Sequence, residues 1–105
     1  MIEITNKNWE SEVLNSKVPV FVDFWASWCS PCKLMSSTLE EIERELSEKL
    51  KILKVNIEED MDLAKRFSIR SLPTVILFIE GKEKERIIGA QNKIMLMKKI
   101  KEYIL

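Results

Sequence analysis

The sequence predicts an α/β fold in which a central, mixed five-stranded sheet is flanked by four helices. Two observations support this prediction. Along the 105 residues, apolar runs of strand length alternate with segments in which apolar residues recur at helical spacing. The predicted order of elements is β-α-β-α-β-α-β-β-α, which favours a mixed sheet with helices on both of its faces.

The first half of the chain is predicted to form two strands and two helices. Residues 2–4 form a short strand, and residues 7–15 form a helix with an apolar stripe of Trp9, Val13 and Leu14. Residues 18–26 contain almost no polar side chain, which is typical of a strand buried on both faces, and Asp23 is the exception. Residues 31–49 form the second helix, with apolar positions at Met35, Leu39, Ile42 and Leu46.

The second half is predicted to form three strands and two helices. The strands cover residues 51–57, 72–79 and 83–89, and a short helix covers residues 60–67. A hairpin turn joins the last two strands at Glu80-Gly81-Lys82. Asn92 caps the last helix, whose predicted apolar stripe consists of Ile94, Met97, Ile100 and Ile104.

Composition narrows the class of protein. Apolar residues make up 46% of the chain, and 17 acidic side chains balance 17 basic ones, so neither nucleic acid nor an anionic membrane is expected as a partner. The first residues lack the features of a signal segment, and no apolar stretch approaches membrane-spanning length. We therefore expect a single domain over residues 1–105 that is monomeric and cytoplasmic.

The two cysteines, Cys29 and Cys32, lie where the apolar run of residues 20–26 gives way to a helical pattern. Residues three apart share a helix face, so this pair is within disulfide range if Cys29 lies at the first turn. There Cys29 also faces unpaired backbone N–H groups and the positive end of the helix dipole, which stabilise a thiolate. The spacing therefore proposes a nucleophilic sulfur and its resolving partner.

Three other interpretations of the pair remain. A zinc site normally needs four ligands, and the chain has no histidine and no second cysteine pair. A structural disulfide across so short a loop yields only about 2 kcal/mol of loop entropy. Two inert buried thiols are the third alternative, although the neighbouring Trp28, Pro31 and Lys33 suit an exposed helix start better.

Further residues have two interpretations each. Burial raises the pKa of a carboxyl group, so Asp23 is either a proton acceptor for a thiol or a hydrogen-bonded structural carboxylate. Pro73, from the strand pattern alone, is an ordinary trans proline that starts a strand. Trp28 either flanks the site or lies in the core, and Trp25 is expected in the core. Lys33 either adds to thiolate stability or is simply a surface charge.

Three segments resemble the thioredoxin family, and the similarity extends in order over the whole chain. They are Asp23-Phe24-Trp25-Ala26-Ser27-Trp28-Cys29-Ser30-Pro31-Cys32-Lys33, then Arg70-Ser71-Leu72-Pro73-Thr74, and finally Gly89-Ala90. The resemblance implies a thioredoxin-like fold. It also implies a protein-disulfide reductase whose redox-active centre is the disulfide Cys29-Cys32.

The resemblance assigns a role to each matching position. It implies that Cys29 attacks the client disulfide, that Cys32 resolves the mixed disulfide, and that Asp23 is the buried acid near Cys32. Lys54 matches the basic neighbour of that acid, and Pro73 matches a cis proline facing the disulfide. The implied substrate surface consists of Trp28, Ser71, Leu72, Pro73, Gly89 and Ala90. Three positions depart from the family pattern. Serine replaces glycine at Ser30 and at Ser71, and Ser37 replaces a proline that often kinks the second helix.

The implied function is thiol–disulfide exchange in electron transport and cell redox homeostasis. The expected partners are disulfide-containing client proteins and a thioredoxin reductase, a flavin-dependent enzyme that draws on NADPH. The chain itself shows no cofactor motif, and no metal is expected. An oxidase or isomerase with the same fold, and a non-catalytic binding subunit, remain the alternatives.

Overall fold

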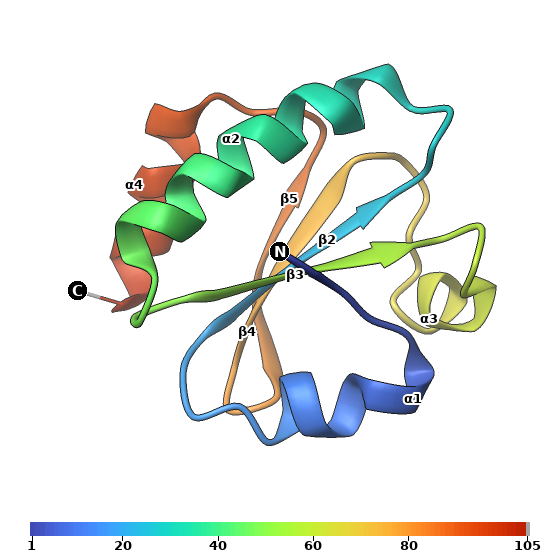
Figure 1. Ribbon diagram of the computed structural model, residues 1–105, viewed down its shortest axis with the longest axis horizontal. Helices are drawn as coiled ribbons and strands as arrows, with labels where there is room; N and C mark the ends of the chain where they lie inside the picture. Colours follow the sequence, from blue (N-terminus) through green and yellow to red (C-terminus); the bar gives the residue numbers. More distant parts are fainter. Residues whose placement is uncertain (105) are drawn as a thin grey trace.

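The sheet has five strands in the order β1-β3-β2-β4-β5, in a computed structural model that describes residues 1–104 (Figure 1). β1 and β2 run parallel to β3, which lies between them, whereas β4 is antiparallel to both β2 and β5. The predicted mixed α/β fold is therefore confirmed. The strands are β1 (Ile2–Glu3), β2 (Val20–Trp25), β3 (Lys51–Asn56), β4 (Thr74–Ile79) and β5 (Lys82–Ile88).

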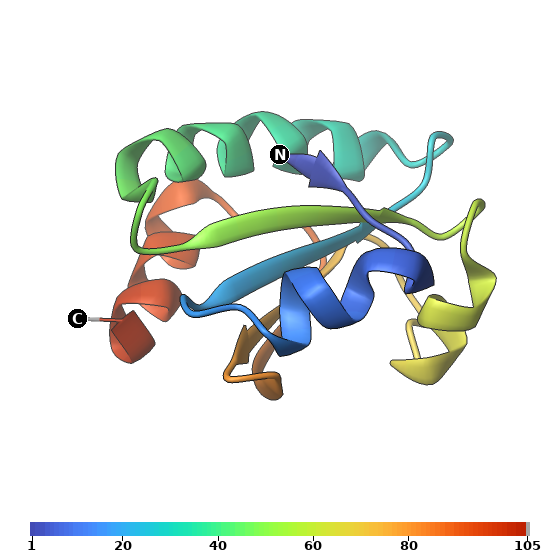
Figure 2. The same ribbon diagram turned by 60° about the horizontal axis from the view of Figure 1, so that its bottom comes forward.

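Helices cover both faces of this sheet. α2 and α4 lie on one side of the strands and α1 and α3 on the other, as Figures 1 and 2 show. None of the helices within residues 1–104 is long and apolar enough to span a membrane. The helices are α1 (Asn6–Trp9), which continues as a π-helix (Glu10–Leu14), α2 (Ser30–Leu46), α3 (Met61–Arg66) and α4 (Lys93–Ile104).

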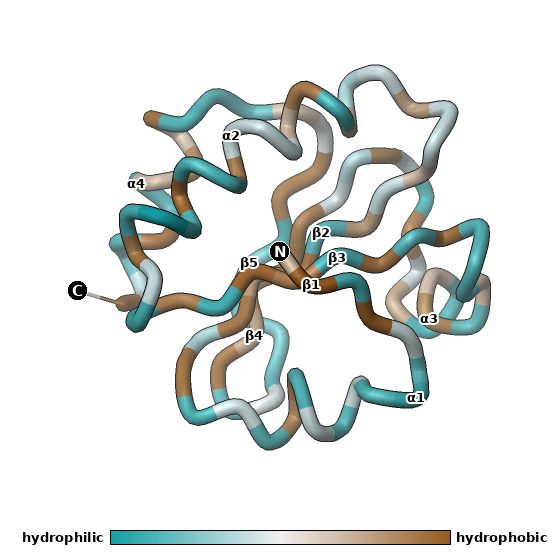
Figure 3. Tube along the Cα trace, viewed as in Figure 1, coloured by the Kyte–Doolittle hydropathy of each residue, from teal (hydrophilic) through white to brown (hydrophobic). Residues whose placement is uncertain are grey.

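The alternation of side chains along β2 divides the core into two layers. Val22 and Phe24 pack with the buried residues of α1 and α3, and Phe21 packs with those of α2 and α4. The hydropathy colours of Figure 3 show apolar residues concentrated along the central strands. β2 is thus buried on both faces, as its composition predicted, and Asp23 lies in it with no exposed surface.

Some element boundaries differ from the predictions. α2 begins at Ser30 and ends at Leu46, three residues before the predicted end, because the next three residues are exposed and the chain must turn to bury Leu50 beside β3. The first helix begins at Asn6, where the Thr5 side chain caps it. β4 begins at Thr74, two residues later than predicted.

Two predicted core residues are exposed. Leu14 is 46% exposed, because it follows the buried Val13 in the π-helix and so lies on a different side, where it contacts Gly81 of the β4–β5 turn. Ile94 is 78% exposed, and α4 buries Leu96 in addition to the predicted Ile100. Residues 94–97 are all apolar, so helical spacing alone did not determine which of them faces the sheet.

The packing of α2 yields a paired test of the core. Leu39 is fully buried and Leu34, on the same helix, is 73% exposed. We expect Leu39→Ala to lower the free energy of unfolding by about 2–5 kcal/mol, because it leaves a cavity against the sheet. Leu34→Ala should change it by less than about 0.5 kcal/mol. Urea unfolding measures both variants, and equal losses would contradict this packing.

Candidate functional site

The cysteine pair lies where β2 passes into α2. Cys29 is the N-cap residue of α2, and its Sγ accepts a hydrogen bond of 3.2 Å from the backbone N–H of Cys32. Pro31 occupies the first turn, where a missing N–H costs nothing. The two sulfur atoms form a disulfide, with 5.3 Å between the Cα atoms. Once the disulfide is reduced, unpaired N–H groups and the helix dipole stabilise a thiolate at Cys29.

The surroundings of the pair are unequally exposed. Cys29 and Cys32 are 5% and 2% exposed, whereas Trp28 is 69% exposed beside them. Of the two interpretations of Trp28, the structure thus supports the one that places it at the site. The remaining predicted neighbours on α2 are all exposed: Ser30, Pro31 and Lys33.

A carboxylate from another loop holds the segment before the cysteines. Glu58 Oε1 accepts hydrogen bonds from the backbone N–H of Ser27, at 2.9 Å, and from its hydroxyl, at 2.8 Å. These two bonds lower the pKa of the Glu58 carboxyl. The sequence analysis missed this contact. Glu58 lies in an acidic stretch typical of a solvated surface, and nothing in the sequence links it to Ser27.

Asp23 lies near Cys32, and both residues line a small cavity. The cavity has a volume of about 70 Å³ and is lined by Asp23, Trp25, Cys32, Lys33, Ser36 and Lys54. Within residues 1–104 neither carboxylate oxygen of Asp23 has a hydrogen-bond partner. The hydrogen-bonded structural carboxylate, one of the two interpretations from the sequence, is therefore not what the structure contains.

The environment of Asp23 favours its protonated form. Burial raises the pKa of Asp23 to about 7, because a charge there would lose its hydration. The Lys54 ammonium opposes this effect and lowers the pKa, while the Glu3 carboxylate adds to it. Asp23 pairs with Lys54 across β2 and β3, so the predicted basic neighbour is in place.

Trp25 and Lys54, which both line the cavity, contact each other. The Lys54 ammonium lies 4.5 Å from the centroid of the Trp25 ring, an arrangement that stabilises a cation. Trp25 is half-buried, so its predicted place in the core is wrong. It is the last residue of β2, and its indole N–H needs a polar partner, which it finds 3.0 Å away at Glu3 Oε2.

The segment around Pro73 lies at the same end of the sheet as the cysteines. The Leu72-Pro73 bond is cis, in line with the family resemblance and not with the strand pattern. Thr74 pairs with Phe24 near the end of β2 and with Ile88 at the end of β5. In Figure 1 the loops before β4 and after β2 meet at this end.

Hydrogen bonds involve three of the residues that were predicted to bind substrate: Ser71, Pro73 and Gly89. The Gly89 N–H donates to the Pro73 carbonyl at 2.8 Å, with Gly89 at a φ of 89°, which favours glycine. The Thr74 hydroxyl donates to the Ser71 carbonyl at 2.7 Å. Pro73 is buried, Leu72 and Gly89 are half-buried, and Ser71 and Ala90 are exposed.

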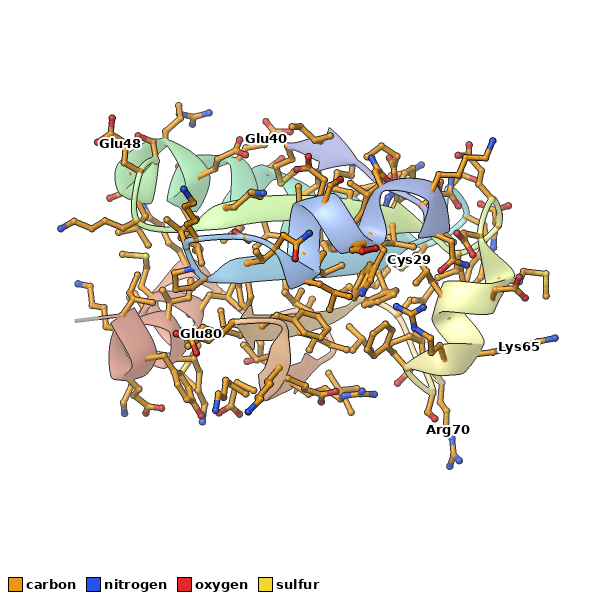
Figure 4. All side chains as sticks on the ribbon, turned by 90° about the horizontal axis from the view of Figure 1, so that it is seen from below. Cys29, Glu40, Glu48, Lys65, Arg70 and Glu80 are labelled. Carbon is orange, nitrogen blue, oxygen red and sulfur yellow. A yellow bond between two sulfur atoms is a disulfide. The ribbon has the colours of Figure 1, made fainter. Side chains whose placement is uncertain are left out.

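Along the horizontal direction of Figure 4, Cys29 lies on the side of Lys65 and Arg70, away from Glu48 and Glu80.

Comparison with known proteins determines the family of this chain. A family model described as thioredoxin matches residues 1–102. The chain belongs to the thioredoxin family. It is a thiol–disulfide oxidoreductase that acts on protein disulfides, and the Cys29-Cys32 pair is its redox-active disulfide. Among residues 1–104 no cluster of three or more His, Cys, Asp or Glu side chains could hold a metal ion.

Individual thioredoxins are similar to this chain over most of its 105 residues. The chain is 45% identical over 101 residues to a thioredoxin of Rickettsia bellii (strain RML369-C), and the aligned region covers 96% of each chain. It is 39% identical over 102 residues to a thioredoxin of Griffithsia pacifica, covering 97% of this chain and 94% of that one. It is 43% identical over 102 residues to the chloroplastic M-type thioredoxin of Spinacia oleracea, covering 97% of this chain and 56% of that one.

The buried acid makes stability depend on pH. The pKa of Asp23 is about 7 in the folded state and has its ordinary value of 3.8 in the unfolded chain. Between these values the folded state binds more protons, so the oxidised protein loses stability as pH rises, by at most about 4 kcal/mol. We expect Asp23→Asn, which cannot ionise, to be more stable than the parent at about pH 8 and similar to it at about pH 4.

Urea unfolding of the oxidised proteins at a series of pH values measures this difference. The matched control is Asp62→Asn, which removes an exposed carboxylate in the first turn of α3 and should change stability by only a few tenths of a kcal/mol. A constant difference between Asp23→Asn and the parent across the pH range would show that burial does not perturb Asp23.

Proposed function

We propose that this thioredoxin-family protein reduces disulfides in client proteins, with Cys29 as the nucleophile and Cys32 as the resolving thiol. The observation that carries this assignment is the position of Cys29 as the N-cap of α2. A sulfur at that position gains a hydrogen bond and the helix dipole when it is a thiolate. Cys32, one turn further along, faces the cavity beside Asp23 and gains neither advantage.

The proposed cycle transfers two electrons from the protein to the client. The Cys29 thiolate attacks one sulfur of the client disulfide, which forms a mixed disulfide and releases the other client sulfur as a thiolate. Cys32 then loses its proton and attacks Cys29 Sγ. The Cys29-Cys32 disulfide forms, and the second client thiolate leaves. A reductase must return two electrons to the protein before the next cycle.

Asp23 is the proposed acceptor of the Cys32 proton. Both residues line the same cavity, whose volume of about 70 Å³ leaves room for a water molecule between them. A pKa of about 7 keeps the carboxyl able to take up and release a proton near neutral pH. Its two unpaired oxygens leave it free to accept that proton.

The proposed client-binding surface surrounds the disulfide. Trp28 offers an exposed aromatic face, and the hydrogen bond from Gly89 to Pro73 holds two loops together at the same end of the sheet. An extended client segment would lie across these loops, with backbone contacts at Leu72. The full proposed set is Trp28, Ser71, Leu72, Pro73, Gly89 and Ala90.

The cellular context is also part of the proposal. We infer a single-domain, monomeric, cytoplasmic electron carrier that is reduced by a thioredoxin reductase with electrons from NADPH. The family match over residues 1–102 and the 96% mutual coverage with a bacterial thioredoxin support a role like that of other thioredoxins. Chloroplastic thioredoxins are among the relatives as well, so location has to be tested by fractionation of the source cells.

Trapping the mixed disulfide tests the two cysteine roles. Reduced Cys32→Ser should form a stable one-to-one adduct with a disulfide-containing client such as insulin, because its attacking sulfur remains and its resolving sulfur is gone. Non-reducing gel electrophoresis and mass spectrometry detect the adduct. The matched control, Cys29→Ser, should form almost none. Equal adduct formation by the two variants, or none by either, would contradict the assignment.

The rate of client release tests the role of Asp23. Release from the mixed disulfide should slow in Asp23→Asn by about 100-fold or more near neutral pH, because general base catalysis contributes about 10²- to 10⁴-fold. Stopped-flow measurement of client release from about pH 6 to about pH 9 follows the effect. Asp62→Asn again serves as the control. An unchanged rate and pH profile in Asp23→Asn would remove Asp23 from the mechanism.

A further inference from the structure

A row of three charged residues crosses the sheet beside the cavity. Glu3 of β1 pairs with Lys54 of β3, and Lys54 pairs with Asp23 of β2. Residues directly paired across neighbouring strands point to the same face, so all three side chains lie on the face covered by α2. The Ile4 N–H, which donates to the Lys54 carbonyl at 2.8 Å, holds β1 in this register.

Trp25 connects Glu3 to the cavity. Its indole N–H donates to Glu3 Oε2 at 3.0 Å, so the side chain reaches from the end of β2 across β3 to β1. On the way the ring passes within 4.5 Å of the Lys54 ammonium, which makes no ion pair with any carboxylate among residues 1–104. Glu3 does not line the cavity. It nevertheless accepts the hydrogen bond of Trp25, whose ring contacts the Lys54 ammonium in the cavity.

The charges that face Asp23 come from three elements. Lys54 approaches from β3, and Lys33 lies on α2 together with the sulfur of Cys32. β4 presents only the apolar Val75 as the partner of Asp23. Glu3 of β1 is the negative charge that acts on Asp23, and it raises the pKa of Asp23 in opposition to Lys54.

The geometry points to Glu3 as a positioning residue of the exchange reaction: it anchors Trp25 beneath Lys54 and partly neutralises the cation that Asp23 faces. This inference rests on the proposed role of Asp23 as the proton acceptor. Without the Glu3 charge, Lys54 would act on Asp23 with its full field. The carboxyl of Asp23 would then ionise at lower pH and become a weaker base for Cys32.

The expected effect can be sized from the sheet. Glu3 and Asp23 are two strands apart, about 10 Å between backbones at ordinary strand spacing. A unit charge at that distance changes the pH at which Asp23 is half ionised by about 0.3 to 1 unit, depending on the effective dielectric constant. Because Glu3 is exposed, about 1 M salt should remove most of the effect.

The test is Glu3→Gln, which removes the charge but keeps an oxygen that can accept the Trp25 hydrogen bond. NMR titration of the Asp23 carboxyl carbon in the oxidised protein should show half-ionisation at lower pH by the amount above, and the pH profile of client release should move with it. The control is Glu48→Gln, which removes an equal exposed charge far from Cys29 in the view of Figure 4.

Two results at low salt would overturn the inference: an Asp23 titration in Glu3→Gln that matches the parent, or an equal displacement in Glu48→Gln. Both results leave the proposed role of Asp23 intact. Failure of that role is distinguishable, because release from Asp23→Asn would then keep the rate and pH profile of the parent. A displacement at low salt that persists in about 1 M salt would also contradict the electrostatic part of the inference.

Discussion

The start of helix α2 directly after β2 is the constraint on which the rest of the site depends. α2 must bury Met35, Leu39 and Ile42 against the sheet, and Cys32 lies in the same row, three residues before Met35. The packing of the helix therefore turns Cys32 inward. Cys29, at the N-cap, precedes this row and meets the free N–H groups of the first turn. One helix thus gives its two sulfur atoms different surroundings.

Because Cys32 faces inward, a carboxyl group in the same cavity serves the proposed proton transfer but lowers the stability of the fold. In the proposed mechanism the Cys32 thiol, which is 2% exposed, passes its proton to an acceptor that lines the same cavity. Asp23 occupies that place on β2, without hydrogen-bond partners among residues 1–104 and with a pKa raised by burial. The fold tolerates this loss of stability because the surrounding strand is otherwise apolar and closely packed.

Groups outside the cysteine motif hold the site in shape. Glu58 fixes the loop before Cys29 through two hydrogen bonds from Ser27. In β1, Glu3 accepts a hydrogen bond from Trp25, whose ring contacts the Lys54 ammonium. Glu3 lies in β1 and Glu58 in the loop after β3, and each accepts a hydrogen bond from a residue that precedes Cys29 by two to four positions. The electrostatics of the site are therefore shared by β1, β2, β3 and the loop that follows β3.

The sequence by itself determined the order of elements, the buried strand with its one acid, and the position of the cysteine pair at a helix start. These follow from local periodicity and from residue spacing, which act over a few residues. Resemblance to the thioredoxin family, and not the strand pattern, indicated the cis bond before Pro73. The register that pairs Asp23 with Lys54 confirmed a neighbour that the resemblance alone had suggested.

Only the tertiary structure decided the contacts between distant segments. Trp25 bonds to Glu3 and Ser27 bonds to Glu58, across 22 and 31 residues of chain. Ile94 faces outward although it is apolar. Residues 94–97 are all apolar, so α4 could present several different apolar faces, and its docking on the sheet determines which one is buried. Local periodicity specifies which residues share a face, but the pairing of strands and the docking of helices determine which faces meet.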